Sequence, residues 1–246
     1  MFIIRKPDIT KKTETPHAPK PPRLLKPTWD IKIARKAIAR NPCIELQRPR
    51  FVFSCTELDD DAKAYLKDFG AATASNGAVG LYHIAGLTPE AVEMGESLIA
   101  ENAQVYVIDD AELERVKNSY PVMWKDPSAK PKLCFIGCPH LTHAQLREWT
   151  DNVCEGLKKS GRKKVAIPTV FTAPPAVCEE FKKTDYAAKL EATGVVLSYI
   201  CPLMYMNNPL AKKMPVITNS NKLRTYTTSR YYTDSEILDI ITKGVK

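Results

Sequence analysis

Four loops of the chain carry side chains that can bind a metal ion or move a proton. In chain order they contain His83, Cys138 with His140, Cys201, and Ser220 with Lys222. Each loop follows a short apolar segment of the kind that forms a buried β-strand. In open α/β sheets, ligands bind beyond the carboxyl ends of the strands, where such loops converge. The four loops are therefore candidates for one shared site.

The residue types in these loops fit iron better than zinc. Cys138 and His140 are too close in sequence for the usual pair of zinc ligands, and the chain has no second pair. An iron–sulfur cluster needs only thiolates that meet in space, and an iron without a cysteine ligand can bind substrate. Such an iron polarises a hydroxyl leaving group, while a serine beside a cation can take up a proton. This chemistry is a dehydration, although two cysteines leave a three-thiolate cluster one ligand short.

Structural roles compete with these chemical ones. Cys134 alternates with apolar residues in a strand, and Cys154 and Cys178 lie at helical spacing, so these three are predicted to be core residues. His83 can equally be a buried core histidine. Cys138 remains open between a functional and a structural role, as do Cys201 and the polar pair Ser220 and Lys222.

An alternation of helices and strands must position these loops. Thr88, Pro89 and Glu90 form a typical helix start. Because strands separated by helices imply parallel pairing, the sequence predicts an α/β fold with a largely parallel sheet. The segments expected to be helical are 59–69 (ended by Gly70), 88 onward, 110–117, 142–160, 176–192 and 234–243. The segments expected to be strands are 78–83, 104–108, 132–137, 165–171, 195–200 and 216–218.

The charge of the chain is concentrated at one end. The 246 residues carry a formal net charge of +8 and 44% hydrophobic residues, which is an ordinary globular composition. Residues 1–50 hold 13 Lys and Arg against 4 Asp and Glu, and 8 of the 19 prolines. The sequence predicts a basic, Pro-rich arm or linker over 1–50 and a globular region over 51–246, as one body or two subdomains. The arm has few aromatic residues, so a nucleic-acid partner is not expected.

With no apolar run long enough for a membrane helix and no secretory signal, a cytoplasmic location without membrane contact is expected.

Several uncommon sequence motifs of the chain resemble motifs of the aconitase X family. Residues 70–79, His83 and 86–91 look like the central signature of that family, and 137–142 resembles its Gly-Cys-Pro-His motif. Residues 199–202 fall where the family has Asp-Thr-Cys, and 218–222 is similar to its Thr-Asn-Ser-x-Lys segment. Order and spacing agree over about residues 55–246.

The resemblance implies an aconitase-like α/β fold and a hydro-lyase activity. Family members dehydrate hydroxy acids such as 5-phosphomevalonate, with a small swivelling subunit, or cis-3-hydroxy-L-proline. They bind substrate at an iron–sulfur cluster held by three cysteines. By resemblance, Cys138 and Cys201 are cluster ligands, and Ser220 is the base, assisted by Lys222. The residues implied to line the substrate pocket are His83, Thr88, Glu90, His140 and Asn219.

The chain departs from the family in ways that shape the hypothesis. The family's Gly-x-x-Cys-Thr-Pro-Tyr segment, with the remaining cysteine ligand, is missing, since neither Cys43 nor Cys55 matches it. The Asp before the third cysteine is replaced by Tyr199 and Ile200. The sequence therefore predicts the carboxyl-terminal half of a split dehydratase, completed by a polypeptide with the amino-terminal half and by a small subunit. Of the two substrates named above, 5-phosphomevalonate is slightly favoured. The alternative is a non-catalytic binding or assembly module that kept the fold and lost the cluster.

Overall fold

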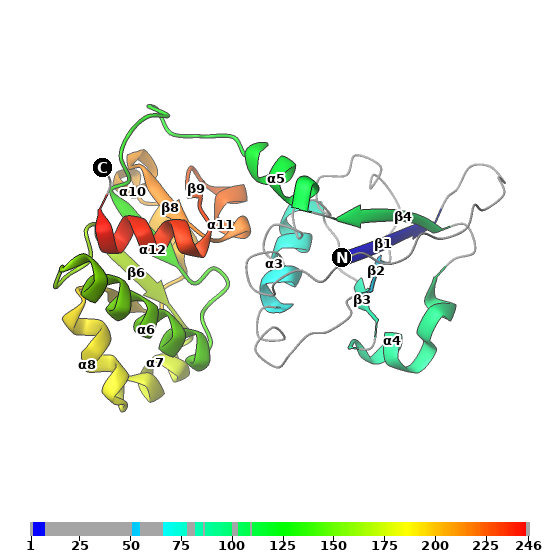
Figure 1. Cartoon of the computed structure of the whole chain (residues 1–246), viewed down its shortest axis with the longest axis horizontal. Coiled ribbons are helices and arrows are strands. Elements are labelled where there is room, and N and C mark those ends of the chain that lie inside the picture. The colour runs from blue at the N-terminus through cyan, green and yellow to red at the C-terminus, as the bar shows by residue number, and fades with distance from the viewer. Residues whose placement is uncertain are drawn as a thin grey trace. The chain divides into compact units, whose positions relative to one another are not determined.

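The structure, a computed structural model, describes residues 2–7, 51–54, 66–77, 82–85, 87–99, 103–108 and 110–244 (Figure 1). The chain divides into an amino-terminal unit, residues 1–119, and a carboxyl-terminal unit, residues 120–246. Each unit is described below by itself.

The amino-terminal unit is built on a mixed four-stranded sheet in the order β3-β2-β1-β4. Strand β1 is antiparallel to β2 and to β4, whereas β2 and β3 are parallel. Its strands are β1 (Phe2–Pro7), β2 (Phe51–Ser54), β3 (Tyr82–Ile84) and β4 (Ala103–Ile108). Its helices are α3 (Leu66–Gly77), α4 (Pro89–Met94), the 3₁₀ turn η2 (Gly95–Leu98) and α5 (Asp110–Asn118).

Two details of this unit differ from the sequence predictions. Residues 2–7, assigned above to the arm, form the central strand β1, and residues 8–50 lie outside the described residues. Helix α3 also continues through Gly70, which was predicted to end it. The helix persists because Phe69 packs edge-on against Tyr82, with ring centroids 4.7 Å apart, and an added Cβ at Gly70 would lie 3.3 Å from the Tyr82 hydroxyl. Tertiary packing here overrides the tendency of glycine to end a helix.

The carboxyl-terminal unit is built on a five-stranded sheet in the order β7-β6-β5-β8-β9, in which every pair is parallel. This confirms the predicted parallel α/β architecture. Its strands are β5 (Leu133–Ile136), β6 (Thr169–Thr172), β7 (Val196–Ser198), β8 (Val216–Thr218) and β9 (Arg230–Tyr231). Its helices are α6 (His143–Ser160), α7 (Pro175–Lys182), α8 (Asp185–Ala192), α9 (Pro202–Met206), α10 (Pro209–Lys213), α11 (Asn221–Tyr226) and α12 (Asp234–Lys243).

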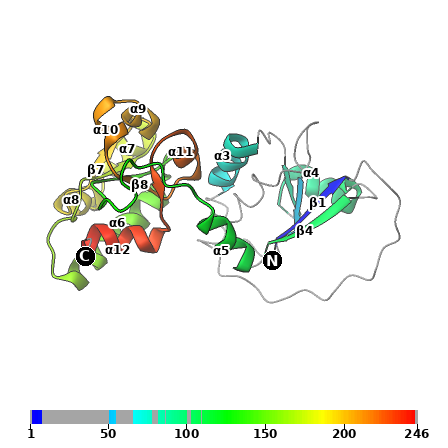
Figure 2. The same ribbon diagram turned by 90° about the horizontal axis from the view of Figure 1, so that it is seen from above.

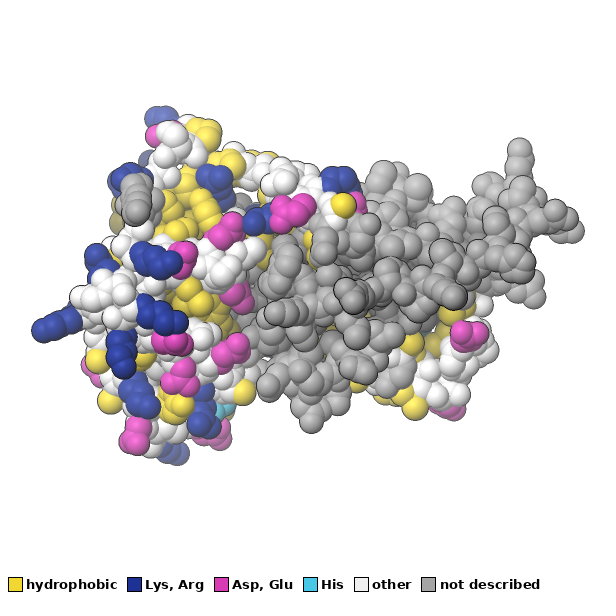
Figure 3. Space-filling model, viewed as in Figure 1, with side chains coloured by type: hydrophobic (Ala, Val, Ile, Leu, Met, Phe, Trp, Pro, Cys, Tyr) yellow, Lys and Arg dark blue, Asp and Glu magenta, His cyan; other side chains and the backbone are white. Residues whose placement is uncertain are grey.

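The two faces of this sheet are covered unequally. Helices α6 and α12 lie on one side of the sheet, and α9 and α10 lie on the other (Figure 2). Because side chains alternate along β5, Cys134 and Ile136 join the large core under α6, α7, α8 and α12, while Phe135 points to the smaller cluster under α9 and α11. The α6/α12 side carries acidic and basic side chains together, as a solvated helix layer does (Figure 3).

Helix α6 shows how local sequence fixes an element beside the site. The hydroxyl of Thr142 accepts a hydrogen bond from Gln145 N at 3.2 Å, and the Gln145 side chain accepts one from Thr142 N at 3.0 Å. This capping box starts the helix, and Gly161 ends it in the left-handed conformation. The buried stripe of Leu146, Trp149 and Val153 faces the sheet.

We expect the Thr142→Ala substitution to lower the free energy of unfolding by about 1 kcal/mol, because the cap hydrogen bond to Gln145 N is lost. Urea denaturation monitored by circular dichroism measures this change. Thr142→Ser keeps the hydroxyl and should restore most of the stability. An equal loss in both variants would contradict the capping role.

The segment predicted as one helix, 176–192, is instead the pair α7 and α8. The break comes at Lys183 and Thr184, where Thr184 is extended and its hydroxyl donates to Phe181 O at 2.7 Å. The turn allows Phe181 and Leu190 to enter the same core.

Among the described residues, no helix combines the length and the apolar character needed to cross a bilayer.

Candidate active site

The strand order of the carboxyl-terminal unit reverses between β5 and β8. Strands β6 and β7 follow β5 on one side of it in the sheet. The chain then returns and adds β8 on the other side of β5. The connections that follow β5 and β8 lead to opposite faces of the sheet, to α6 on one and to α11 on the other, which is the arrangement that forms ligand sites in open parallel sheets. The loop after β5 holds Cys138 and His140, and the loop after β8 holds Asn219, Ser220 and Lys222.

The loop after β5 is held tightly against β6. Gly137 has φ +108°, and a Cβ built on it would lie 2.3 Å from Thr172 O and 2.6 Å from Thr172 Oγ1. The Thr172 hydroxyl donates to Gly137 O at 2.7 Å, and Leu141 N donates to Thr172 O at 2.8 Å. Only glycine fits this position. The result is a sharp turn that leaves Cys138 buried and His140 half-buried, with a cis peptide bond between Cys138 and Pro139.

The loop after β8 is bonded directly to the loop after β5. The Ser220 hydroxyl donates to the carbonyl of Cys138 and accepts a hydrogen bond from Leu223 N at 2.9 Å. Ser220 is buried and is the N-cap of α11. The structure thus brings together Cys138 and Ser220, two residues that are 82 positions apart in the chain. Lys222 is half-buried two residues further on.

Asn219 is fixed by a residue that the sequence analysis did not single out. Its amide nitrogen donates to Asp234 Oδ1 at 2.7 Å, and Asp234 is the first residue of α12. This pair could not be predicted from the sequence, because Asp234 has the pattern of an ordinary acidic residue in the first turn of a helix. The contact orients the Asn219 side chain beside Ser220.

Cys201 begins α9 and is half-buried. The turn that carries it is anchored by Ser198, whose hydroxyl accepts from Ile200 N at 3.1 Å and bonds the Tyr205 hydroxyl at 2.9 Å. Leu203, Tyr205 and Met206 of α9 pack in the cluster that contains Cys138, so α9 covers the face of the sheet on which Cys138 lies, and the loops that hold the two cysteines follow parallel strands at the same edge. With β6 between them, the ends of β5 and β7 are about 10 Å apart at ordinary strand spacing.

The other described cysteines have the character of core residues. Cys134 and Cys178 are buried, as predicted, and Cys154 is half-buried on α6. Burial, and to a smaller extent the Asp234 carboxylate, raises the pKa of the Cys134 thiol. Burial also raises the pKa of the Cys154 and Cys178 thiols. Metal binding requires thiolate, so these environments disfavour a ligand role. Cys43 and Cys55 lie outside the described residues.

An iron–sulfur cluster fits this edge of the sheet in part. Cys138 and Cys201 lie in loops at the same edge of the sheet, and neighbouring residues hold both turns. Within the described ranges, no three His, Cys, Asp or Glu side chains lie close enough together to hold a metal ion. The described residues therefore place two cysteine loops at this edge of the sheet, without a third potential ligand beside them.

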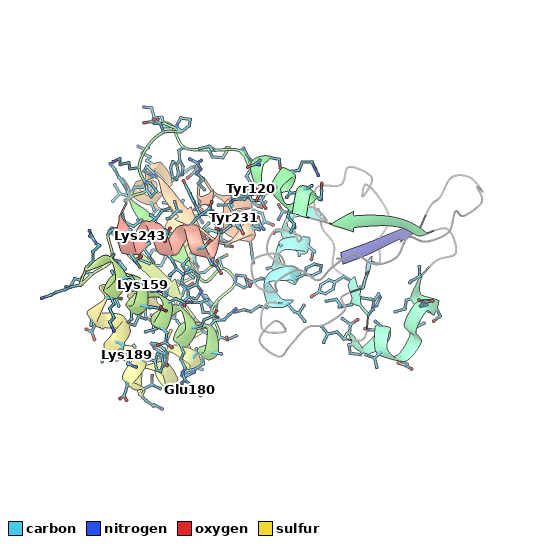
Figure 4. The ribbon with its side chains drawn as sticks, viewed as in Figure 1. Tyr120, Lys159, Glu180, Lys189, Tyr231 and Lys243 are labelled. Atoms are coloured by element: carbon cyan, nitrogen blue, oxygen red, sulfur yellow. The ribbon has the colours of Figure 1, made fainter. Side chains whose placement is uncertain are left out.

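Helix α11 is supported by contacts between Arg224 and the aromatic pair Tyr120 and Tyr231. The guanidinium lies 4.8 Å from the centre of the Tyr120 ring, and Tyr120 packs edge-on against Tyr231 with ring centroids 5.2 Å apart (Figure 4). Arg224 is buried one turn after Ser220. These contacts tie α11 to β9 and help to hold the Ser220 cap in place.

The remaining predicted site residues belong to the amino-terminal unit. His83 lies in β3 and is buried, with Nδ1 3.7 Å from Glu90 Oε2. Thr88 is the N-cap of α4 and Pro89 its first residue, as predicted. The Thr88 hydroxyl makes no cap bond, however, and instead accepts from Ile84 N at 3.0 Å, which closes the loop. Within this unit, the structure thus brings His83, Thr88 and Glu90 together.

Comparison with known proteins identifies the family of the chain. Residues 31–118 match the family model described as the aconitase X second domain, and residues 131–240 match the aconitase X third domain. The chain is 32% identical over 120 residues to the phosphomevalonate dehydratase large subunit of Thermococcus kodakarensis, covering 49% of this chain and 28% of that protein. It is 30% identical over 165 residues to the Methanosarcina mazei protein of the same name, covering 67% and 36%.

The fold comparison gives the same result. A crystal structure of Thermococcus kodakaraensis aconitase X in its holo form is similar to the chain, with a TM-score of 0.68 and 22% identity. The match covers 87% of this chain and 52% of that one. The matches to the two large subunits cover 28% and 36% of those proteins, so the chain spans about a third of the length of the curated relatives it matches. The two domain matches, the relatives and the shared fold show that the chain belongs to the aconitase X family.

Proposed function

We propose that the chain is part of an iron–sulfur hydro-lyase that dehydrates a hydroxy acid. The observation that carries the proposal is the hydrogen bond between the Ser220 hydroxyl and the Cys138 carbonyl. It joins a candidate proton acceptor to a candidate iron ligand at the switch point of the parallel sheet, where ligands bind in such folds.

Cys138 and Cys201 are proposed to hold the cluster. When bound, the cluster supplies a Lewis-acidic iron that polarises the substrate hydroxyl. The chain's own part is to hold the two thiols on one face. Thr172 fixes the turn before Cys138, and Ser198 with Tyr205 fixes the turn before Cys201.

Ser220 is proposed to accept the substrate proton. Dehydration breaks a C–H and a C–O bond and forms a C=C bond, and the proton and the hydroxide leave as water. The Ser220 hydroxyl must first release its own proton to water, and the resulting alkoxide then takes the proton from the substrate carbon. The ammonium of Lys222, two residues further along the chain, is proposed to stabilise the alkoxide. The proposed substrate contacts are Asn219, His140, His83, Thr88 and Glu90.

Charge favours a multiply anionic substrate. Residues 192–233 contain no Asp or Glu, and they carry Lys212, Lys213, Lys222, Arg224 and Arg230. This stretch includes α9, α10, α11 and the loop after β8. An excess of one charge over a site raises the local concentration of ligands of the opposite charge. Together with the names of the relatives, it favours 5-phosphomevalonate over cis-3-hydroxy-L-proline.

The site is proposed to be completed by other polypeptides. The relatives are named large subunits, which fits a small partner subunit, and the third thiolate is proposed to come from a polypeptide with the amino-terminal half of the family.

The test is turnover by the chain, purified anaerobically with these polypeptides. We expect loss of water from 5-phosphomevalonate at a rate at least tenfold higher than from cis-3-hydroxy-L-proline. Serine at Cys201 should abolish the reaction, whereas serine at Cys154 should preserve it. Absence of turnover in a complex that contains a full cluster would overturn the proposed function.

The second candidate is a non-catalytic binding or assembly module. Its support is that the described residues include no group of three potential metal ligands, and that Tyr199 and Ile200 stand where the family has Asp and Thr. Under this alternative, serine or alanine at Cys138 and Cys201 changes neither metal content nor any activity of the complex.

A further inference from the structure

The large hydrophobic residues that are exposed in the described part of the carboxyl-terminal unit are concentrated in one stretch of its sequence. Of the seven large hydrophobic residues exposed in its described part, six fall between residues 196 and 226, and none lies on α6, α7, α8 or α12. We define the apolar face as these six residues: Val196, Tyr199, Ile200, Met204, Leu210 and Tyr226. A concentration of exposed apolar residues on one face of a domain marks an interaction site.

The helix layer on this face is also thin. Helices α9 and α10 have five residues each and α11 has six, whereas α6 on the opposite face has eighteen. Met204 and Leu210 are 65% and 77% exposed, although both lie on helices of the layer. Ordinary α/β sheets bury both faces under full helix layers, so this face is incomplete.

Charge identifies the kind of partner that fits. The apolar face lies within residues 192–233, which contain no acidic residue, and Lys212 and Lys213 are exposed on α10 beside Leu210. By contrast, the α6/α12 side of the sheet mixes both signs (Figure 3). Charge complementarity therefore requires a partner surface that is apolar at its centre and rimmed by carboxylates.

The position of Cys201 identifies the partner further. Cys201 directly follows Tyr199 and Ile200 and lies one helical turn before Met204. A polypeptide that adds a thiolate to a cluster on Cys201 must approach this sulfur, and it then covers these three neighbours. The match covers 52% of the similar crystal structure, so about half of that chain lies outside the matched part.

We propose that the apolar face docks the polypeptide that carries the amino-terminal half of the family and the third cluster thiolate. The proposal rests on the proposed function for the identity of this partner. The contact has an apolar centre at Tyr199, Ile200 and Met204 and a basic rim at Lys212 and Lys213.

The experiment measures binding without iron. The probe is the polypeptide from the same organism whose sequence matches the amino-terminal part of the large-subunit relatives. Its affinity for the full chain is measured by calorimetry in the Cys138→Ser background, which removes cluster assembly from the result. We expect Met204→Asp to weaken binding at least tenfold, because it places a carboxylate in the apolar centre. Leu210→Asp serves as the second variant.

Met123→Asp is the matched control, because Met123 is an equally exposed methionine of the same unit, 59% against 65%, and lies outside the apolar face. It should leave the dissociation constant within twofold of the parent value. Thermal melting of each variant alone should match the parent, which shows that the fold is intact.

The experiment gives different results when the docking surface is wrong and when the proposed function is wrong. Wild-type binding that is undetectable, or that Met204→Asp and Leu210→Asp leave unchanged, overturns the docking surface, whatever the complex catalyses. Binding that is lost in these two variants and kept in Met123→Asp supports the surface, even if the wild-type complex contains no iron. In that last case the dehydratase proposal fails alone.

Discussion

Replacing Gly137 with alanine is expected to lower the free energy of unfolding of the carboxyl-terminal unit by about 2–5 kcal/mol. Two effects add. The backbone has φ +108°, which L-residues adopt only under strain, and the new Cβ would lie 2.3 Å from Thr172 O. Strand β6 or the turn must move to relieve this overlap. Since the Gly137 turn also sets the position of Cys138, we expect the variant to lose the site together with the stability.

Gly161→Ala is the matched control for this prediction. Gly161 also has a positive φ, +69°, but a Cβ at this position meets nothing within 4 Å. Only the backbone strain remains, and the expected cost is about 1 kcal/mol. Urea denaturation of both variants separates strain from overlap. Equal losses at the two positions would show that the contact between Gly137 and Thr172 contributes nothing.

The second large effect is on turnover. Ser220→Ala is expected to lower the dehydration rate by about 10²–10⁴-fold, the usual contribution of a positioned general base. The same change removes the N-cap of α11 and the bond to the Cys138 carbonyl, which should cost only about 1–3 kcal/mol of stability. Rate and stability are therefore predicted to respond very differently.

Thr233→Ala tests whether a lost cap alone slows the reaction. Thr233 is buried and caps α12 through Glu236, as Ser220 caps α11 through Leu223. We expect about 1 kcal/mol of destabilisation and a nearly unchanged rate. If Thr233→Ala slows turnover as much as Ser220→Ala does, Ser220 is a structural cap and another group takes the proton.

Local patterns predicted much of the carboxyl-terminal unit. The long helix from Thr142 and the last helix, 234–243, agree with the structure because caps and apolar spacing are both local signals. The convergence of the loops that hold Cys138 and Ser220 was also predictable, since parallel strands end at one edge. The aconitase-like fold is confirmed.

The features that were predicted wrongly or missed depend on contacts between residues that are far apart in the sequence. The helix through Gly70 and the break at Thr184 are decided by packing against Tyr82 and by the core around Phe181. The pairing of β1 with β2 and β4 joins residues about fifty and a hundred positions apart, which no periodicity reveals. Helices α9, α10 and α11 are too short to show a repeating apolar pattern. The bond between Asn219 and Asp234 likewise follows only from strand order.

The most direct measurement is the iron and acid-labile sulfide content of the anaerobic complex in single-cysteine variants. If Cys138 and Cys201 share one cluster, serine at either position should remove the brown absorption and nearly all of the iron, and the double variant should behave like each single one. Cys154→Ser, at a similarly half-buried thiol, should retain the full content. Iron and sulfide that persist at wild-type levels without Cys201 would contradict the shared cluster.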